Sequence, residues 1–318
     1  MTLQLEDIEA AAARIKPYVL RTPTLKRRVH NTTLHLKAES LQPIGAFKLR
    51  GAFNVMTQLP PDCPGVVAHS SGNHAQAVAR AASVLGIRAV IVMPDNAPPL
   101  KRARTEADGA EVIIVGPDSN ERAERAAQIA AAEGLVPVSP YNDLGIAAGQ
   151  GTAAVELLED SGGTLQRFYA PVSGGGLMAG CAVALCTLTP EIEIVAVEPQ
   201  TKPSLQQSLL AGERVAVPPP PTIADGLRVR VPGEITWPIL QRRVTRSELV
   251  SDEELKEAMV WALSECRLVL EPSGAASLAV ALRECRANSA AHVGVLLSGG
   301  NVDPNLFAEI SKRAADGA

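Results

Sequence analysis

The chain has 318 residues, of which 46% are hydrophobic and 20% charged, and its formal net charge is -4. These are ordinary values for a globular protein, and the length fits about two domains. The charge balance argues against a nucleic-acid partner, because Lys26–Arg28 and Lys101–Arg102 are short basic runs that we expect at a solvated surface.

Membrane insertion and disulfide bonding are also not expected. No apolar stretch reaches 18 residues, and Met1–Ala10 lacks the pattern of a signal peptide. The five cysteines are widely spaced and form no C-x-x-C pair, which argues against a disulfide framework or a structural zinc site. We therefore predict a cytoplasmic protein with no membrane partner.

Hydrophobic periodicity predicts an alternation of short strands and longer helices along the chain. Strands are predicted over Leu34–Ala38, Val66–His69, Arg88–Met93, Glu111–Val115, Arg167–Val172, Glu191–Val197 and Ala291–Leu297. Helices are predicted over Leu5–Ile15, Lys48–Gln58, from His74 to Leu85, over Ala97–Ala107, Asn120–Glu133, Ala147–Leu158, from Leu177 to Leu188, and over Ser251–Cys266. This order predicts an α/β protein with right-handed βαβ units and mostly parallel sheets.

Three loops of Ser, Gly and Asn follow predicted strands: Ser70–His74, Ser173–Leu177 and Ser298–Asn301. Such loops lie at the carboxyl ends of parallel strands, where ligands bind in open α/β sheets. Gly174, Gly175 and Gly176 can turn several backbone N–H groups toward one phosphate, and the following helix adds its partial positive charge. This loop is the strongest candidate for an anion cradle.

A dinucleotide is an alternative ligand for the same loop. Gly174–Ala179 also fits the pattern G-x-G-x-x-A, and Glu198 follows Gly176 by 22 residues, close to the spacing of an acidic ribose ligand. The loop alone does not distinguish the two phosphate ligands. Other motifs in the sequence are needed to distinguish a dinucleotide from another phosphate ligand.

A lysine in an unusual setting favours a cofactor that carries an aldehyde. Lys48 lies at the start of a predicted helix, after a turn that contains Gly45 and beside Phe47. An amine must be neutral to react with an aldehyde, whereas a free lysine has a pKa of about 10.4. Burial or nearby positive charge lowers that pKa, which makes Lys48 a candidate for covalent attachment.

Four motifs in order resemble those of the serine/threonine dehydratase and serine racemase family, which are fold-type II pyridoxal-phosphate enzymes. Ser40–Ala52 resembles the family's lysine motif, and His69–Gln76 its asparagine loop. Ser173–Leu177 resembles its tetraglycine loop, with Ser173 in place of the first glycine, and Leu297–Asn301 resembles its C-terminal serine loop. The resemblance spans nearly the whole chain and implies pyridoxal 5'-phosphate as the cofactor.

The resemblance also implies a role for each matching residue. Lys48 would hold the cofactor as an imine and later act as the general base, Phe47 would pack beside the ring, and Asn73 would bond the ring hydroxyl. Gly174, Gly175, Gly176 and Leu177 would hold the phosphate, and Ser298 would face the pyridine nitrogen. The substrate carboxylate would bind to Ser70, Ser71, Asn73 and His74. In serine racemases, the serine that matches Ser71 acts on the substrate face opposite the lysine, so Ser71 is also a candidate catalytic residue.

Two departures from the family pattern affect the expected site. Glu198 matches a carboxylate that binds Mg²⁺ or Ca²⁺ in many members, but Ser204 stands where the second acidic ligand would be. Because a hard cation prefers more than one carboxylate, a metal site at Glu198 is doubtful. Ser139–Tyr141 stands where the family often has His-Pro, which affects the expected shape of the substrate cleft.

We therefore expect two open, mostly parallel-sheet α/β domains with the cofactor in the cleft between them. Residues 1–60 and 144–318 would form the larger domain, and residues 61–143 a smaller domain that closes over the substrate. The expected activity is that of an ammonia-lyase that converts a serine- or threonine-like β-hydroxy amino acid to a 2-oxo acid and ammonia. Serine racemase, a bifunctional racemase and dehydratase, and 3-hydroxyaspartate dehydratase are alternatives, and a dinucleotide-dependent oxidoreductase is a remote one. The family suggests a homodimer.

Overall fold

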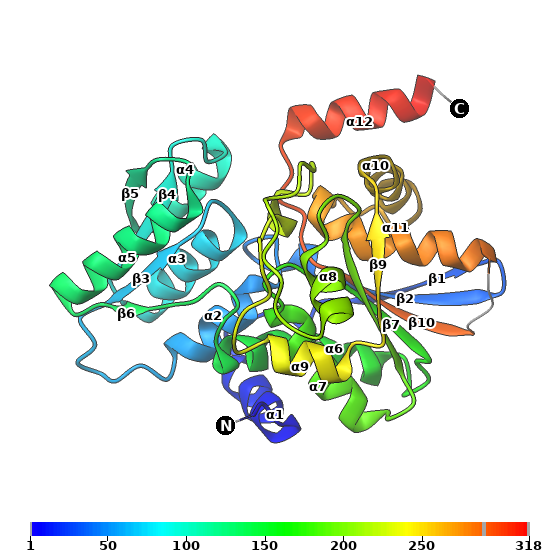
Figure 1. The fold of residues 1–318 in the computed structure, drawn as a ribbon, viewed down its shortest axis with the longest axis horizontal. Helices are drawn as coiled ribbons and strands as arrows, with labels where there is room; N and C mark the ends of the chain where they lie inside the picture. The colour runs from blue at the N-terminus through cyan, green and yellow to red at the C-terminus, as the bar shows by residue number, and fades with distance from the viewer. Residues whose placement is uncertain (1, 288–290, 317–318) are drawn as a thin grey trace.

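The computed structural model describes residues 2–287 and 291–316, which form two sheets flanked by helices. Figure 1 shows the smaller sheet with α3, α4 and α5 on one side of the molecule and the larger sheet with the remaining long helices on the other. Within each sheet every strand pair is parallel except β1 with β2. The predicted α/β class with two mostly parallel sheets is confirmed.

The larger sheet has the strand order β1-β2-β10-β7-β8-β9. Its strands are β1 (Thr24–Val29), β2 (Thr32–Ala38), β7 (Arg167–Pro171), β8 (Glu193–Pro199), β9 (Arg246–Val250) and β10 (His292–Leu297). The C-terminal strand β10 lies between β2 and β7, with Leu297 opposite Ala38. The sheet thereby brings the residues after β2, the glycine loop after β7 and the serine loop after β10 to one edge.

The smaller sheet has the order β5-β4-β3-β6. Its strands are β3 (Val66–His69), β4 (Ala89–Pro94), β5 (Glu111–Val115) and β6 (Val136–Pro137), linked by α3 (Asn73–Leu85), α4 (Pro99–Ala107) and α5 (Ser119–Glu133). All four strands fall within residues 61–143, and the strands of the larger sheet fall outside this segment. The exact domain boundaries stay a prediction.

The remaining helices are α1 (Leu5–Ile15), α2 (Lys48–Met56), α6 (Leu144–Asp160), α7 (Gly176–Leu188), α8 (Ser204–Ala211), α9 (Trp237–Arg243), α10 (Asp252–Trp261), α11 (Pro272–Ala287) and α12 (Pro304–Asp316). The helix predicted to begin after Ser251 has the expected capping box with Glu254, and it ends in a π-helical turn over Ala262–Cys266. Strands β1, β6 and β9 were not predicted. Strand β1 contains Lys26–Arg28 and lies at an edge of the sheet. It has no apolar pattern that would predict a strand, and it is recognised by its pairing with β2.

Helices α6 and α7 pack unusually closely. A Cβ atom on Gly180 would lie 2.0 Å from the carbonyl oxygen of Ala147, and one on Gly151 would lie 2.7 Å from the carbonyl oxygen of Gly180. Only glycine fits at these two positions, because the backbones of the two helices touch. The N-terminus of α7, which carries the glycine loop, is therefore held firmly against α6.

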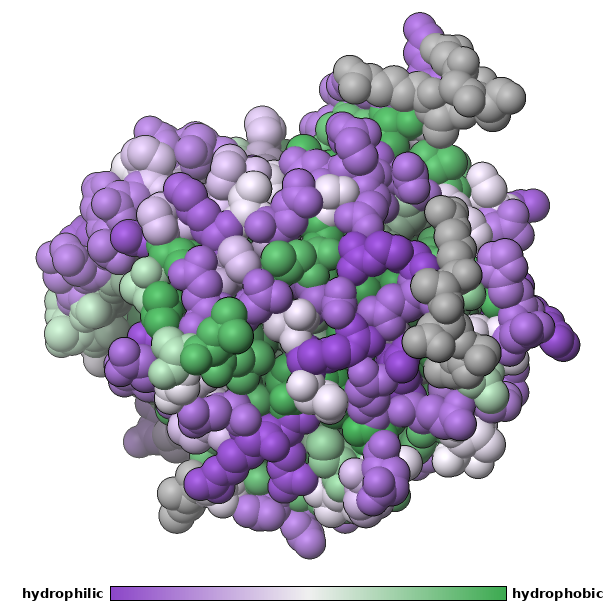
Figure 2. Space-filling view, turned by 45° about the vertical axis from the view of Figure 1, so that its right-hand side comes forward, coloured by the Kyte–Doolittle hydropathy of each residue, from purple (hydrophilic) through white to green (hydrophobic). Residues whose placement is uncertain are grey.

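The surface is mixed in polarity. The face in Figure 2 is mainly hydrophilic, with small apolar patches between polar side chains. The exposed large apolar residues are dispersed along the chain, for example Val84, Leu188 and Leu210. None of the helices in the described residues is long and apolar enough to cross a membrane. All five cysteines are free, as expected, and Cys181, Cys266 and Cys285 are buried.

Candidate active site

Lys48 lies half-buried at the first turn of α2, and its amine contacts a backbone carbonyl group. Its Nζ atom donates a hydrogen bond to the carbonyl oxygen of Pro140 at 2.5 Å and lies 5.2 Å from the centroid of the Phe47 ring. Among the described residues, no carboxylate lies within ion-pair distance of this amine. Burial alone lowers the pKa of Lys48 to about 8, which makes the neutral, reactive amine accessible near neutral pH.

The serine loop after β10 is joined to the lysine turn by backbone contacts. Phe47 N–H donates to the carbonyl oxygen of Ser298 at 3.1 Å, and Gly300 N–H donates to that of Gly45 at 2.9 Å. Gly45 has a φ of +74°, and a Cβ atom there would lie 2.6 Å from Asn301 Oδ1. The turn before Lys48 therefore requires glycine both for its conformation and for the approach of the loop.

Asn73 lies at the start of α3 and contacts two residues of the larger half of the molecule. Its Nδ2 donates to Glu271 Oε1 at 2.5 Å, and its Oδ1 accepts from Asn301 Nδ2 at 2.9 Å. Because Asn301 belongs to the same loop as Ser298, Asn73 and Ser298 are brought to the same side of the lysine turn. The amide of Asn73 retains one N–H group for a further acceptor.

The neighbours of Asn73 in the asparagine loop have different environments. Ser70 Oγ accepts from Gly72 N–H at 3.1 Å, and Ser71 is half-buried. His74 is buried, its Nε2 bonds the carbonyl oxygen of Val138 at 2.9 Å, and burial followed by the charge of Lys48 lowers its pKa to about 3. His74 is therefore neutral at physiological pH. If His74 contacts a substrate carboxylate, as predicted, its backbone N–H group is the donor.

The glycine loop begins α7 and has the geometry of an anion cradle. Gly175 has a φ of +98°, and a Cβ atom on Gly174 would lie 2.2 Å from the ring of Tyr141. Thr236 Oγ1 donates to the carbonyl oxygen of Gly174 at 2.7 Å, which fixes the loop from behind. The first N–H groups of an α-helix have no intrahelical acceptor, so those of Gly176 and Leu177 are available to a phosphate.

The segment Ser139–Asn142 connects the lysine to the glycine loop. Pro140 supplies the carbonyl group that binds Lys48, and the next side chain, Tyr141, lies against Gly174. Ser139 Oγ accepts from Asn142 N–H at 2.9 Å, which stabilises the turn between them. The structure thus brings together the four motifs that the sequence predicted to form one site.

Glu198 lies on β8 and has protein donors of its own. Its two carboxylate oxygens accept from the N–H groups of Leu205 and Gln206, each at 2.8 Å, at the start of α8. Ser247 Oγ donates to it at 3.0 Å. In the described part of the chain no cluster of three or more potential metal ligands occurs, and a cation at Glu198 stays a prediction.

Glu271 and Lys101 contact the site but were not predicted to, and Asn301 lies in the predicted serine loop without having been given a role. Glu271 and Asn301 bond Asn73, and Lys101 Nζ lies 2.7 Å from Asp225 Oδ2 and 3.7 Å from Glu271 Oε2. The expectation that Lys101 lies at a solvated surface is wrong, because only 7% of it is exposed. The segment Pro99–Ala107 is mostly polar, and no local pattern indicates that Lys101 faces another part of the protein.

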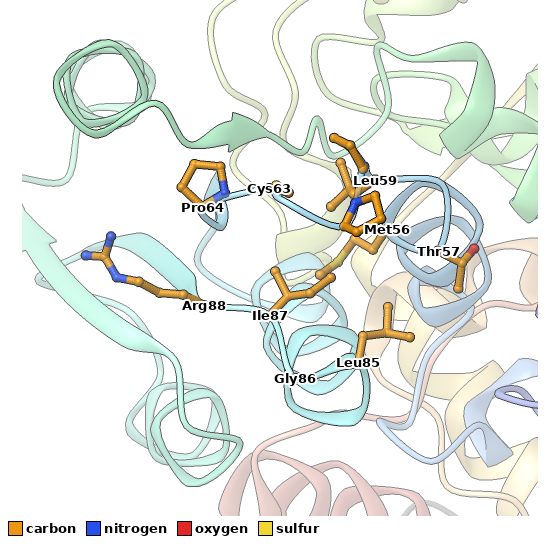
Figure 3. A pocket seen from close by; sticks show the side chains of 11 residues that line it. Met56, Thr57, Leu59, Cys63, Pro64, Leu85, Gly86, Ile87 and Arg88 are labelled. Carbon is orange, nitrogen blue, oxygen red and sulfur yellow. The ribbon is translucent and has the colours of Figure 1, made fainter.

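The site differs from the cavity drawn in Figure 3. That cavity has a volume of about 480 Å³ and lies where the end of α2 approaches the end of α3, lined by residues such as Met56, Cys63 and Ile87. None of the predicted site residues lines it. The chemistry-bearing side chains instead lie where the carboxyl ends of the two sheets meet.

The donor set fits pyridoxal phosphate. The adjoining loops carry a half-buried lysine with a lowered pKa, a glycine cradle at a helix N-terminus, an amide donor and a buried serine hydroxyl. Residues 15–299 match the family described as "Pyridoxal-phosphate dependent enzyme". The chain belongs to this family of enzymes.

The similar proteins include ammonia-lyases and serine racemases. It is 40% identical over 317 residues to the L-threo-3-hydroxyaspartate ammonia-lyase of Saccharomyces cerevisiae, covering 98% of this chain and 97% of the relative. It is 38% identical to the L-threonine ammonia-lyase of Thermotoga maritima, covering 97% and 78%. The structure of maize serine racemase matches with a TM-score of 0.92 and 36% identity, covering 100% of this chain and 99% of that one. The predicted family is confirmed, and the dinucleotide alternative loses its support.

Proposed function

We propose that the enzyme is an ammonia-lyase that removes water and ammonia from a small β-hydroxy amino acid such as serine or threonine. The observation that carries this proposal is the half-buried Lys48, whose amine is joined through Pro140 and Tyr141 to the glycine loop. Ammonia-lyases are prominent among the relatives, which supports the same reaction class.

The proposed roles follow from the positions of the side chains. Gly174, Gly175, Gly176 and Leu177 would bind the cofactor phosphate, Asn73 and Ser298 would bond its ring, and Phe47 would pack beside it. When bound, pyridoxal phosphate supplies a sink for the electron pair left at the substrate α-carbon. Lys48 would remove the α-proton, because its lowered pKa suits a general base near neutral pH.

The loop Ser70–His74 would bind the substrate carboxylate at the start of α3. A helix N-terminus favours a negative charge, Ser70 and Ser71 carry hydroxyl groups that can donate to it, and Asn73 can donate through its backbone N–H group. Ser71 would also be placed to exchange a proton on the face opposite Lys48, which is the requirement for racemisation. A racemase activity beside the lyase activity is therefore the second candidate, supported by the likeness to serine racemases.

A third candidate, 3-hydroxyaspartate, is favoured by the position of Arg122. This residue lies in the first turn of α5, close enough to His69 to lower the pKa of His69, which burial also lowers. Its Nη1 donates to the carbonyl oxygen of Pro117, whereas its buried Nε has no hydrogen-bond partner among the described residues. A guanidinium near His69, which precedes the asparagine loop, could bind a second substrate carboxylate.

The decisive experiment compares three substrates with the purified enzyme after addition of pyridoxal phosphate. L-serine, L-threonine and L-threo-3-hydroxyaspartate are each assayed for 2-oxo acid and ammonia, and serine is also assayed for the D-isomer by chiral chromatography. The proposal requires release of 2-oxo acid that depends on Lys48. An enzyme that binds the cofactor but releases no 2-oxo acid from any of them would contradict it.

A matched pair of variants tests the contribution of Arg122. Arg122→Gln is expected to lower kcat/KM for 3-hydroxyaspartate about tenfold or more, because a charge-assisted hydrogen bond is lost, and to change kcat/KM for serine little. Arg125→Gln is the control, since Arg125 lies on the same helix and is exposed. Equal losses for both substrates would exclude a specific role. Cytoplasmic location, a homodimer and a divalent cation stay predictions.

A further inference from the structure

Four polar side chains form a hydrogen-bonded chain that crosses between the two halves of the molecule. Arg104 Nη1 donates to Asn301 Oδ1 at 2.7 Å, Asn301 Nδ2 donates to Asn73 Oδ1 at 2.9 Å, and Asn73 Nδ2 donates to Glu271 Oε1 at 2.5 Å. Arg104 and Asn73 lie on helices that flank the smaller sheet, and Asn301 and Glu271 lie on loops of the larger half. The chain therefore alternates between the halves at each step.

The residues at the two ends of this hydrogen-bonded chain, Arg104 and Glu271, determine in which direction its hydrogen bonds are donated. A guanidinium can only donate hydrogen bonds and an ionised carboxylate can only accept them, so the asparagines between them have one favourable orientation. Asn301 has no spare N–H group, because its Nδ2 also donates to the carbonyl oxygen of Ile44 at 2.7 Å. Turning the amide of Asn73 over would place its oxygen against the Glu271 carboxylate and its N–H groups against those of Asn301.

Glu271 is kept in an environment that is costly for a carboxylate. Only 2% of the residue is exposed, and its Oε2 has no hydrogen-bond partner among the described residues, although Lys101 Nζ lies 3.7 Å from it. Room for it exists because residue 299 is glycine, where a Cβ atom would lie 2.4 Å from Oε1. A buried, partly unsatisfied carboxylate is unfavourable for folding, which points to a role in the site.

We propose that Glu271 is a positioning residue that fixes the amide of Asn73, so that the remaining N–H group of Asn73 faces the ring oxygen of the cofactor. Arg104 defines the opposite end of the same chain. This inference rests on the proposed binding of pyridoxal phosphate at Lys48. The inference adds that the N–H group of Asn73 is oriented only when the smaller half contributes Arg104 and Asn73 and the larger half contributes Asn301 and Glu271.

The consequence is a shift in the ionisation of the cofactor ring oxygen. A donating N–H group stabilises the ionised oxygen, and this form of the bound cofactor absorbs visible light. If the amide turns over, its carbonyl oxygen favours the protonated ring hydroxyl, which shifts absorption toward the near-ultraviolet. The ratio of the two absorption bands therefore reports the orientation of Asn73 without any substrate.

The charged groups around Glu271 predict how this ratio depends on pH. Burial raises the pKa of Glu271, Lys101, which approaches from α4, lowers it, and Asp225 raises it, so that the resulting pKa is about 7. Below about pH 7 the carboxyl group becomes protonated and can donate as well as accept. The visible band of the wild-type enzyme should therefore weaken as the pH falls through about 7.

The experiment compares Glu271→Gln with wild type after reconstitution with pyridoxal phosphate. A glutamine can donate or accept, so the orientation of Asn73 is no longer fixed. We expect the ratio of the visible to the near-ultraviolet band to fall about tenfold and to lose its dependence on pH near 7. Glu159→Gln is the control, because Glu159 is an exposed carboxylate paired with Arg21. Arg104→Met should lower the ratio in the same direction.

Each possible result either supports or overturns the proposed role of Glu271. A folded Glu271→Gln enzyme with the wild-type band ratio and pH dependence would overturn it. If that variant does not fold, Arg104→Met carries the test, and an unchanged ratio there would overturn it as well. A wild-type protein that takes up no pyridoxal phosphate would overturn both this inference and the proposed function. A Glu271-dependent ratio in an enzyme that releases no 2-oxo acid would overturn the proposed function alone.

Discussion

Two lysines near the site have pKa values that are shifted in opposite directions. Lys48 lies on α2 and contacts a backbone carbonyl group, and burial lowers its pKa to about 8. Lys101 lies on α4, and burial acts on it in the same direction, but the charges of Glu271 and Asp225 raise its pKa above the ordinary value. The comparison teaches that burial alone does not make a lysine reactive, because the neighbouring charges decide which form is stable.

The two lysines consequently serve different purposes. Lys48 can lose its proton near neutral pH and react as a nucleophile or base. Lys101 stays a cation and holds a loop of the larger half, through Asp225, against the helix that flanks the smaller sheet. Four predictions test this contrast, beginning with the largest effect.

Replacing the reactive lysine should remove the chemistry. Lys48→Ala is expected to lower kcat about a thousandfold or more, because the general base is lost. It should also abolish covalent attachment of the cofactor, which mass spectrometry after borohydride reduction detects. If a reduced, cofactor-bearing peptide from another part of the chain appeared instead, Lys48 would not be the attachment site.

Replacing the charged lysine should affect stability more than chemistry. Lys101→Met leaves Asp225 and the buried Glu271 without their cation, and we expect the free energy of unfolding to fall by about 2 kcal/mol. Urea denaturation monitored by circular dichroism measures this change. Arg88→Gln, which removes an exposed ion-pair partner, is the control and should change stability little. Equal effects of both substitutions would remove the contrast.

The pH dependence of cofactor uptake should reveal the lowered pKa of Lys48. The amine is protonated below its pKa, so the rate of covalent uptake should fall about tenfold for each pH unit below 8 and level off above it. A lysine with an ordinary pKa would keep gaining rate to a much higher pH. Stopped-flow absorbance with the cofactor-free enzyme provides the profile, and a blocked lysine derivative in solution provides the reference.

The smallest effect is expected where Lys101 loses one of its two acidic neighbours. Asp225→Asn removes one charge but leaves Glu271, so we expect a loss of about 1 kcal/mol in the free energy of unfolding. The pKa of Glu271 should fall, since Asp225 is one of the groups that raise it. A loss as large as that of Lys101→Met would mean that Asp225 alone holds the lysine.

The sequence predicted those parts of the site that a local pattern encodes. Lys48, the glycine loop and Ser298 each follow a turn or a strand whose residue types have a direct chemical reason. Glu271 and Lys101 were missed because their roles depend on contacts across the two halves of the chain. Lys101 in particular belongs to a short run of basic residues that, without its partners, indicates a solvated surface.

The same distinction holds for the fold. The parallel strands with apolar runs were predicted nearly to their ends, whereas the two-residue strand β6 and the charged strands β1 and β9 were missed. Strand β9 contains Arg246 and Glu248, whose side chains form ion pairs with residues of β8 and α11, and with each other. Charged strands at a sheet edge are recognised by their partners rather than by their own periodicity.

The glycine contact between α6 and α7 has a consequence for how this enzyme can change. Gly151 and Gly180 leave no space for even one methyl group, so the helix that begins with the phosphate loop has almost no freedom to shift. Altered substrate preference is therefore more accessible through α3, α4 and α5, which approach the site from the smaller sheet. The larger half therefore constrains the phosphate site, whereas the smaller half has more freedom to change at positions other than Asn73 and Arg104.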